Sequence, residues 1–143
     1  MARELLLIAL VAASGCARCS RSAPAEAAGK PLASKAFYRL DAGPQTPCAR
    51  GATCEARLVL TALGDYHVNK DYPFKFVGDP GALPIDGPGT FAIDDAKHLT
   101  MTLQFRPTAT GTAKVTGQLK LSVCSDDTCE IETPTLELAI PVS

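Results

Sequence analysis

The sequence predicts an all-β fold, an immunoglobulin-like antiparallel β-sandwich in a single domain. The first observation is period-two alternation, most clearly over residues 98–106, where Leu99, Met101, Leu103 and Phe105 share one parity. A strand with one buried and one solvated face produces this pattern. The second is that turns rich in glycine and proline separate short segments, and the third is that no convincing amphipathic helix is present. Short strands joined by such turns are typical of a sandwich.

The strands are expected from about residue 36 to the end of the chain. In order they are 37–40, 57–62, 66–69, 72–77, 91–93, 98–106, 115–123 and 135–142. Residues 78–89 contain several prolines and glycines and are expected to form a long irregular loop. A loop of this kind in a compact domain is often functional.

Composition limits the classes of partner. The chain has 143 residues with 14 basic and 15 acidic side chains, so no basic surface is predicted and a nucleic-acid partner is not expected. Six cysteines are many for a short cytosolic protein and usual for an exported one. We expect no cofactor and no metal ion, because the cysteine spacings do not suit zinc and the acidic pairs lack a calcium-loop spacing.

The N-terminus indicates export. Arg3 precedes an apolar run over residues 5–13, which is too short to span a bilayer and suits a signal peptide. The small residues before Cys16 resemble the bacterial lipobox. That resemblance implies a lipoprotein-type signal peptide over 1–15 and a diacylglycerol anchor on Cys16. Ordinary cleavage near Gly15 or after Ala23 is the alternative.

The lipoprotein resemblance also implies a location and a domain order. Ala17, rather than aspartate, follows Cys16, which favours the periplasmic side of the outer membrane in a bacterial envelope. Residues 16–35 are rich in alanine, serine, proline and glycine and are predicted to be a flexible tether. The domain is expected over 36–143. Cys19 is the odd cysteine. The motif from Cys16 to Cys19 is rejected as a redox motif, because it follows the apolar run of a signal peptide and not a strand that leads into a helix.

Two close cysteine pairs lie within the predicted domain. Cys48 and Cys54 flank a glycine-containing loop and are interpreted as a structural disulfide. Cys124 and Cys129 are separated by four small or polar residues between two alternating segments, so a chain reversal can bring them within bonding distance. Val123 belongs to the inward parity, so Cys124 is expected to point outward or toward the strand end, at an accessible rim.

The segments 64–69, 72–75 and 116–129 together resemble the N-terminal periplasmic domain of the thiol:disulfide interchange protein DsbD. The similarity covers roughly 36–142 and implies an immunoglobulin-like domain with a reactive cysteine pair. It maps Cys124 and Cys129 onto that pair, and Tyr66 and Val68 onto the strand beside it. It also implies a covering loop within 87–95, with Phe91 as its aromatic residue, and partners that are periplasmic thioredoxin-like or other thiol/disulfide proteins.

The sequence departs from that family in ways that bear on activity. Glu130, Ile131 and Glu132 follow the second cysteine where the family has a proline pair, and the pair Cys48/Cys54 is extra. Acidic residues surround the loop and no Lys or Arg lies in it, which disfavours the thiolate. The functional hypothesis is therefore thiol:disulfide exchange within a docked complex. The alternative is a non-catalytic envelope module with inert disulfides.

Overall fold

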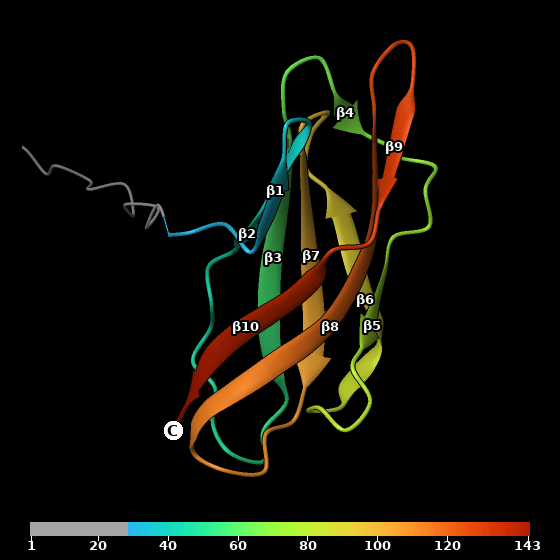
Figure 1. Cartoon of the computed structure of the whole chain (residues 1–143). Coiled ribbons are helices and arrows are strands. Elements are labelled where there is room, and N and C mark those ends of the chain that lie inside the picture. Colours follow the sequence, from blue (N-terminus) through green and yellow to red (C-terminus); the bar gives the residue numbers. More distant parts are fainter. Residues whose placement is uncertain (1–28) are drawn as a thin grey trace, which may run out of the picture.

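The computed structural model describes residues 29–143, which contain ten β-strands and no helix (Figure 1). The predicted signal peptide, Cys16, Cys19 and most of the predicted tether lie outside the described residues. Within 29–143 no helix is long and apolar enough to cross a membrane. The strands are β1 (Ala33–Lys35), β2 (Tyr38–Ala42), β3 (Cys54–Ala62), β4 (His67–Val68), β5 (Lys75–Gly78), β6 (Ile85–Ile93), β7 (His98–Phe105), β8 (Gly111–Cys124), β9 (Cys129–Glu132) and β10 (Thr135–Val142).

The strands form two antiparallel sheets, and this confirms the predicted immunoglobulin-like β-sandwich. The first sheet has the order β1-β2-β3-β7-β6. The second sheet is built on β8, a strand of 14 residues. Along one edge β8 pairs with β10 and then with β9, and along its other edge it pairs with β5 and then with β4. In Figure 1, β8 and β10 cross in front of β3 and β7.

The core lies between the sheets and is mostly aliphatic, as the composition predicts. Alternate residues of β3, β7 and β10 are buried, which is the period-two pattern of the sequence. The largest fully buried side chains come from both sheets, and they include Tyr38, Leu58, Leu103, Phe105, Leu119, Leu121 and Ile140. The long alternating segments therefore fold as the sequence predicts, since each has an apolar face that only the other sheet can cover.

The first strand begins before residue 36. Residues 33–35, assigned to the tether by composition, form β1, and Leu32 N–H donates to the Leu40 carbonyl at 2.8 Å. Lys35 of β1 then donates to a carboxylate oxygen of Glu132 in β9 at 2.6 Å. This contact raises the pKa of Lys35, chiefly because Glu132 accepts the hydrogen bond. The start of the domain thus reaches the strand that follows the second cysteine pair.

The loop predicted over 78–89 is a loop over 79–84 only, and most of the segment expected to hold the covering loop, 87–95, is strand. β6 begins at Ile85 and pairs with β7, with a break in register between Asp86 and Thr90. Gly87 and Gly89 have φ of 73° and 88° on either side of Pro88, a backbone that other residues rarely adopt. From Ile85 onward the expectation of a loop was wrong, because Gly87, Pro88 and Gly89 build a β-bulge within a paired strand and not a chain reversal.

Candidate functional site

The two disulfides lie at opposite ends of β8. Cys48–Cys54 is closed with its Cα atoms 5.3 Å apart, and both residues are buried. Ser143 N–H donates to the Cys48 carbonyl and Arg50 N–H to the Ser143 carbonyl, each at 2.9 Å. The bridge therefore closes the loop before β3, and the hydrogen bonds to Ser143 hold this loop against the residue that follows β10. Its burial and its contacts support a structural role.

The second disulfide, Cys124–Cys129, closes the hairpin between β8 and β9. The two cysteines are directly opposite each other in the ladder, with Cα atoms 3.9 Å apart. Ser125 N–H donates to the Thr128 carbonyl at 2.7 Å, and the Ser125 hydroxyl accepts from the N–H groups of Asp127 and Thr128. This short turn explains why cysteines five positions apart in sequence meet across two strands.

The two cysteines of this bridge differ in exposure. Cys124 is only 7% exposed, whereas Cys129 is exposed. The prediction that Cys124 lies at an accessible rim was wrong as to which cysteine is accessible. Its parity does place it on the outer face, but it stands on the central strand with neighbours on both sides. Cys129 stands on β9, at the edge of the sheet, and keeps its access to solvent.

His67 is the third member of this row. It pairs directly opposite Cys124 on the side of β8 away from Cys129. Directly opposite residues of antiparallel strands share a face, with Cβ atoms about 4.5–5.5 Å apart. The register therefore puts His67, Cys124 and Cys129 in one row on the same face of the sheet. Sequence reasoning assigned His67 no role, because 57 positions separate it from Cys124 and only the register of β4 on β8 joins them.

A second row lies one step down the same face. Ser122 is completely buried, and its hydroxyl accepts from the Asn69 side-chain amide at 3.2 Å. Opposite Ser122 on the other side is Ile131, whose side chain is 64% exposed. Asn69 N–H also donates to the Ser122 carbonyl at 3.2 Å, so β4 is held against β8. These bonds fix the position of His67 two residues earlier.

The three predicted supporting residues, Tyr66, Val68 and Phe91, do not lie on the outer face with the cysteines. Val68 pairs with Val123, and both are fully buried between the sheets. Tyr66 packs against the core, with its ring centroid 5.4 Å from that of Phe37. Phe91 belongs to β6, where its ring lies 5.8 Å from that of Phe74. Of the three, only Val68 is paired with a residue next to Cys124, and it faces the core, whereas His67 lies in the outer row.

The four carboxylates of the hairpin lie either at its tip or on the face opposite to the cysteines. Asp126 and Asp127 are exposed at its tip, beyond the disulfide. Glu130 and Glu132 pair with Val123 and Leu121, so they lie on the parity opposite to the cysteines. Glu132 is bound by Lys35. The carboxylates that the sequence places around the pair are thus directed to the tip and to the other face, which leaves His67 as the titratable side chain in the row itself.

Within residues 29–143 no group of three or more His, Cys, Asp or Glu side chains is arranged to hold a metal ion. Comparison of the chain with protein-family models gave no match, and comparison with curated proteins also gave none. The site thus consists of one exposed cysteine, one buried cysteine and a histidine paired opposite the buried one.

Proposed function

We propose that this protein is an exported thiol:disulfide exchange module that passes electrons between protein partners through Cys124 and Cys129. The observation that carries the proposal is the unequal exposure of two bonded cysteines at the end of the sandwich. An exposed disulfide is open to attack by a thiolate, whereas a buried one is protected. The resemblance to the DsbD N-terminal domain supports the same activity. The presence of two disulfides favours an oxidising compartment, in keeping with export and with an anchor at Cys16.

The exchange begins with Cys124 and Cys129 joined as a disulfide and the partner protein reduced. A partner thiolate attacks the exposed Sγ of Cys129 in line with the sulfur–sulfur bond, and Cys124 leaves as a thiolate. A mixed disulfide now joins the partner to Cys129. A second thiolate of the partner attacks its own bonded sulfur and releases Cys129. Two electrons move from the partner to the domain, the partner becomes a disulfide, and both domain cysteines end as thiols after taking up two protons.

His67 acts on the leaving group in this scheme. A protonated imidazole beside Cys124 stabilises the thiolate that forms when the bridge opens. A charge about 5 Å away is worth on the order of 1 kcal/mol at a partly exposed site, which is about fivefold in rate. The hairpin loop has no basic residue of its own, so the charge that stabilises the Cys124 thiolate comes from His67 on β4. His67 is a positioning residue for the chemistry at Cys124.

We expect His67→Gln to slow reduction of the domain by reduced thioredoxin, used as a protein thiol probe, by about threefold to tenfold. The matched control is His98→Gln, because His98 lies on β7, where its Nδ1 is 2.9 Å from Asp95. A purely structural histidine would leave the equilibrium between dithiol and disulfide unchanged. The proposal requires His67→Gln to shift that equilibrium toward the disulfide as well, measured by alkylation and mass spectrometry.

The same assay separates the proposed function from the alternative, an envelope module with inert bridges. Exchange requires reduced thioredoxin to open one bridge per chain, at Cys124–Cys129, while Cys48–Cys54 survives. If both bridges survive in the native protein, the exchange function is wrong and the binding or structural module remains.

A further inference from the structure

The outer face of the second sheet carries two lysines placed directly opposite each other. Lys75 of β5 pairs with Lys120 of β8, and both side chains are exposed. Like charges directly opposite on antiparallel strands repel each other and destabilise the pair. In the described part of the chain neither lysine takes part in an ion pair, although Lys35, Arg39, Arg57 and Lys114 each do. Two unneutralised positive charges at this point favour an acidic partner.

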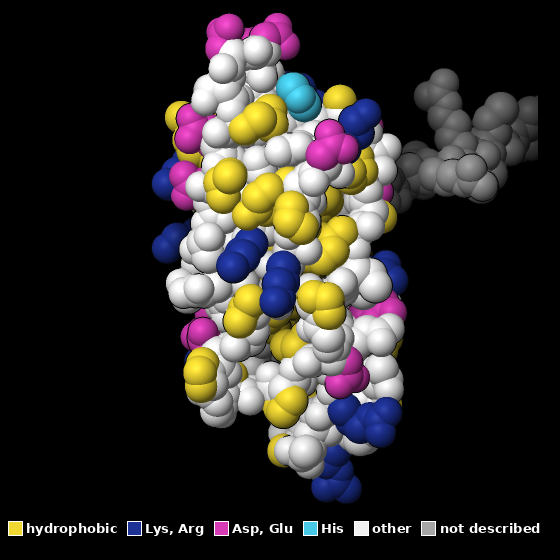
Figure 2. All heavy atoms as spheres, turned by 90° about the vertical axis from the view of Figure 1, so that its right-hand side faces the viewer, with side chains coloured by type: hydrophobic (Ala, Val, Ile, Leu, Met, Phe, Trp, Pro, Cys, Tyr) yellow, Lys and Arg dark blue, Asp and Glu magenta, His cyan; other side chains and the backbone are white. Residues whose placement is uncertain are grey.

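Exposed apolar side chains flank the lysines. Val77 is 41% exposed one step along β5, and Ile131 is 64% exposed in the row between the lysines and the disulfide. Figure 2, which views the side where β5, β6 and β9 lie, shows basic side chains surrounded by hydrophobic ones, with acidic side chains at one end. We call Lys75, Val77, Lys120 and Ile131 the docking face.

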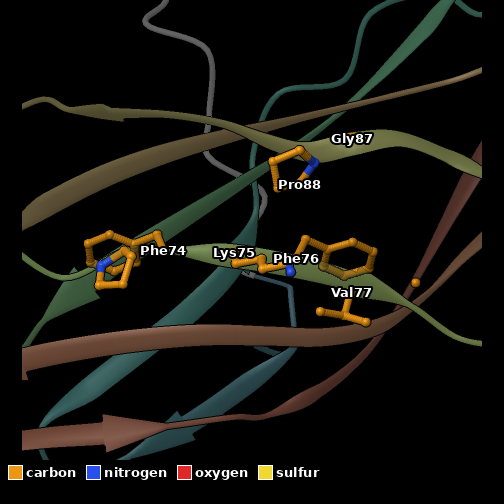
Figure 3. A pocket seen from close by; sticks show the side chains of 8 residues that line it. Phe74, Lys75, Phe76, Val77, Gly87 and Pro88 are labelled. Atoms are coloured by element: carbon orange, nitrogen blue, oxygen red, sulfur yellow. The ribbon is translucent and has the colours of Figure 1, made fainter.

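A groove opens along the edge of this face. It has a volume of about 640 Å³ and lies between β5 and the bulge of β6. Figure 3 shows Lys75 and Val77 along β5, with Pro88 across from them on β6. The bulge that replaces the expected loop thus forms the far wall. The groove can seat an apolar side chain next to Lys75.

We propose that the docking face binds the thiol partner, and that this partner carries acidic residues near its reacting cysteine. This proposal rests on the proposed exchange function. The distance between the disulfide and the lysines follows from their positions along β8. Lys120 is four residues from Cys124, which corresponds to roughly 13 Å at about 3.3 Å per residue. A partner strand laid along this face with its cysteine at Cys129 therefore brings a residue four positions away to the lysines. An Asp or Glu there neutralises them, and an apolar neighbour reaches Ile131 or the groove.

Two synthetic cysteine peptides test this directly. Both are otherwise neutral, with a single cysteine and either Glu or Lys at the fourth position on each side of it. Their second-order rates with the oxidised full chain are measured by alkylation and mass spectrometry at low and at high salt. The variant is Lys75→Glu with Lys120→Glu. The control is Lys30→Glu with Lys114→Glu, which has the same change in net charge away from the docking face, and mercaptoethanol is the uncharged thiol.

We expect the Glu peptide to react at least about fivefold faster than the Lys peptide at low salt, with the ratio falling toward one at high salt because the charges are screened. The ratio inverts in the Lys75/Lys120 variant and persists in the control, and mercaptoethanol reacts equally with all three proteins. If both peptides react at the rate of mercaptoethanol, the docking face is wrong and the exchange function stands. If mercaptoethanol itself fails to open the bridge, both are wrong.

Discussion

Replacing Cys124 with serine is expected to leave Cys129 as a thiol that forms a stable mixed disulfide with oxidised glutathione. Cys129 is exposed on an edge strand, and in this variant no second sulfur is beside it to displace the glutathione. In the reduced wild-type protein the adduct is short-lived, because Cys124 attacks it and closes the internal bridge. The adduct is detected as a mass increase of the intact protein.

The complementary variant, Cys129→Ser, is the matched control. Its remaining thiol, Cys124, is 7% exposed between two neighbouring strands, so we expect it to be modified at least about tenfold more slowly, since access limits thiol exchange. The account of the site is contradicted if Cys129→Ser takes up glutathione as fast as Cys124→Ser. That result would agree with an outward, attacking Cys124, as parity alone suggests.

Gly117→Ala is expected to destabilise the domain by about 3 kcal/mol, because it overpacks a close approach of two strands. A Cβ at this position would lie 2.3 Å from the Val77 carbonyl oxygen and 2.6 Å from the Phe76 ring. Because the nearest atom is backbone, the clash is relieved only if β5 moves away from β8. For a domain of this size the melting temperature falls by roughly 10–20 °C. Thermal unfolding followed by circular dichroism measures it.

Gly78→Ala is the control for this variant. Gly78 is directly opposite Gly117, but a Cβ there would lie 3.9 Å from its nearest neighbour, Ile85. We therefore expect a change within about 0.5 kcal/mol. Equal melting temperatures for the two variants would contradict the β5–β8 packing. Since β5 also carries Lys75 and Val77, that outcome would remove the basis for the docking face too.

The fold was predictable where one segment carries its own pattern. β3, β7, β8 and β10 are long enough that period-two alternation is visible in each alone. β1 has three residues and β6 contains a bulge with two glycines and a proline, so neither has a local pattern. Both become strands because a neighbour, β2 or β7, offers unpaired backbone groups. Tertiary pairing overrides local preference at these places.

Within the site, the meeting of the two cysteines was predictable from the sequence, but the residues around them were not. Cys124 and Cys129 are close in sequence, so a single hairpin explains their meeting. The burial of Cys124 and the position of His67 both depend on the pairing of β4 with the edge of β8 that faces away from β9. This pairing joins His67 to Cys124, which are 57 residues apart in the sequence. The opposed lysines likewise depend on the register of β5. No periodicity within one segment encodes such a register, which explains why sequence reasoning found the sulfurs and missed their neighbours.

The most direct test of the exchange function is the equilibrium of the two disulfides with a glutathione redox buffer. The native protein is held at a series of potentials, its thiols are trapped by alkylation, and each bridge is counted by mass spectrometry. We predict that Cys124–Cys129 opens at a potential well above about −300 mV, while Cys48–Cys54, buried and structural, stays closed there. If Cys124–Cys129 also stays closed at and above that potential, it is a structural bridge and the exchange function is contradicted.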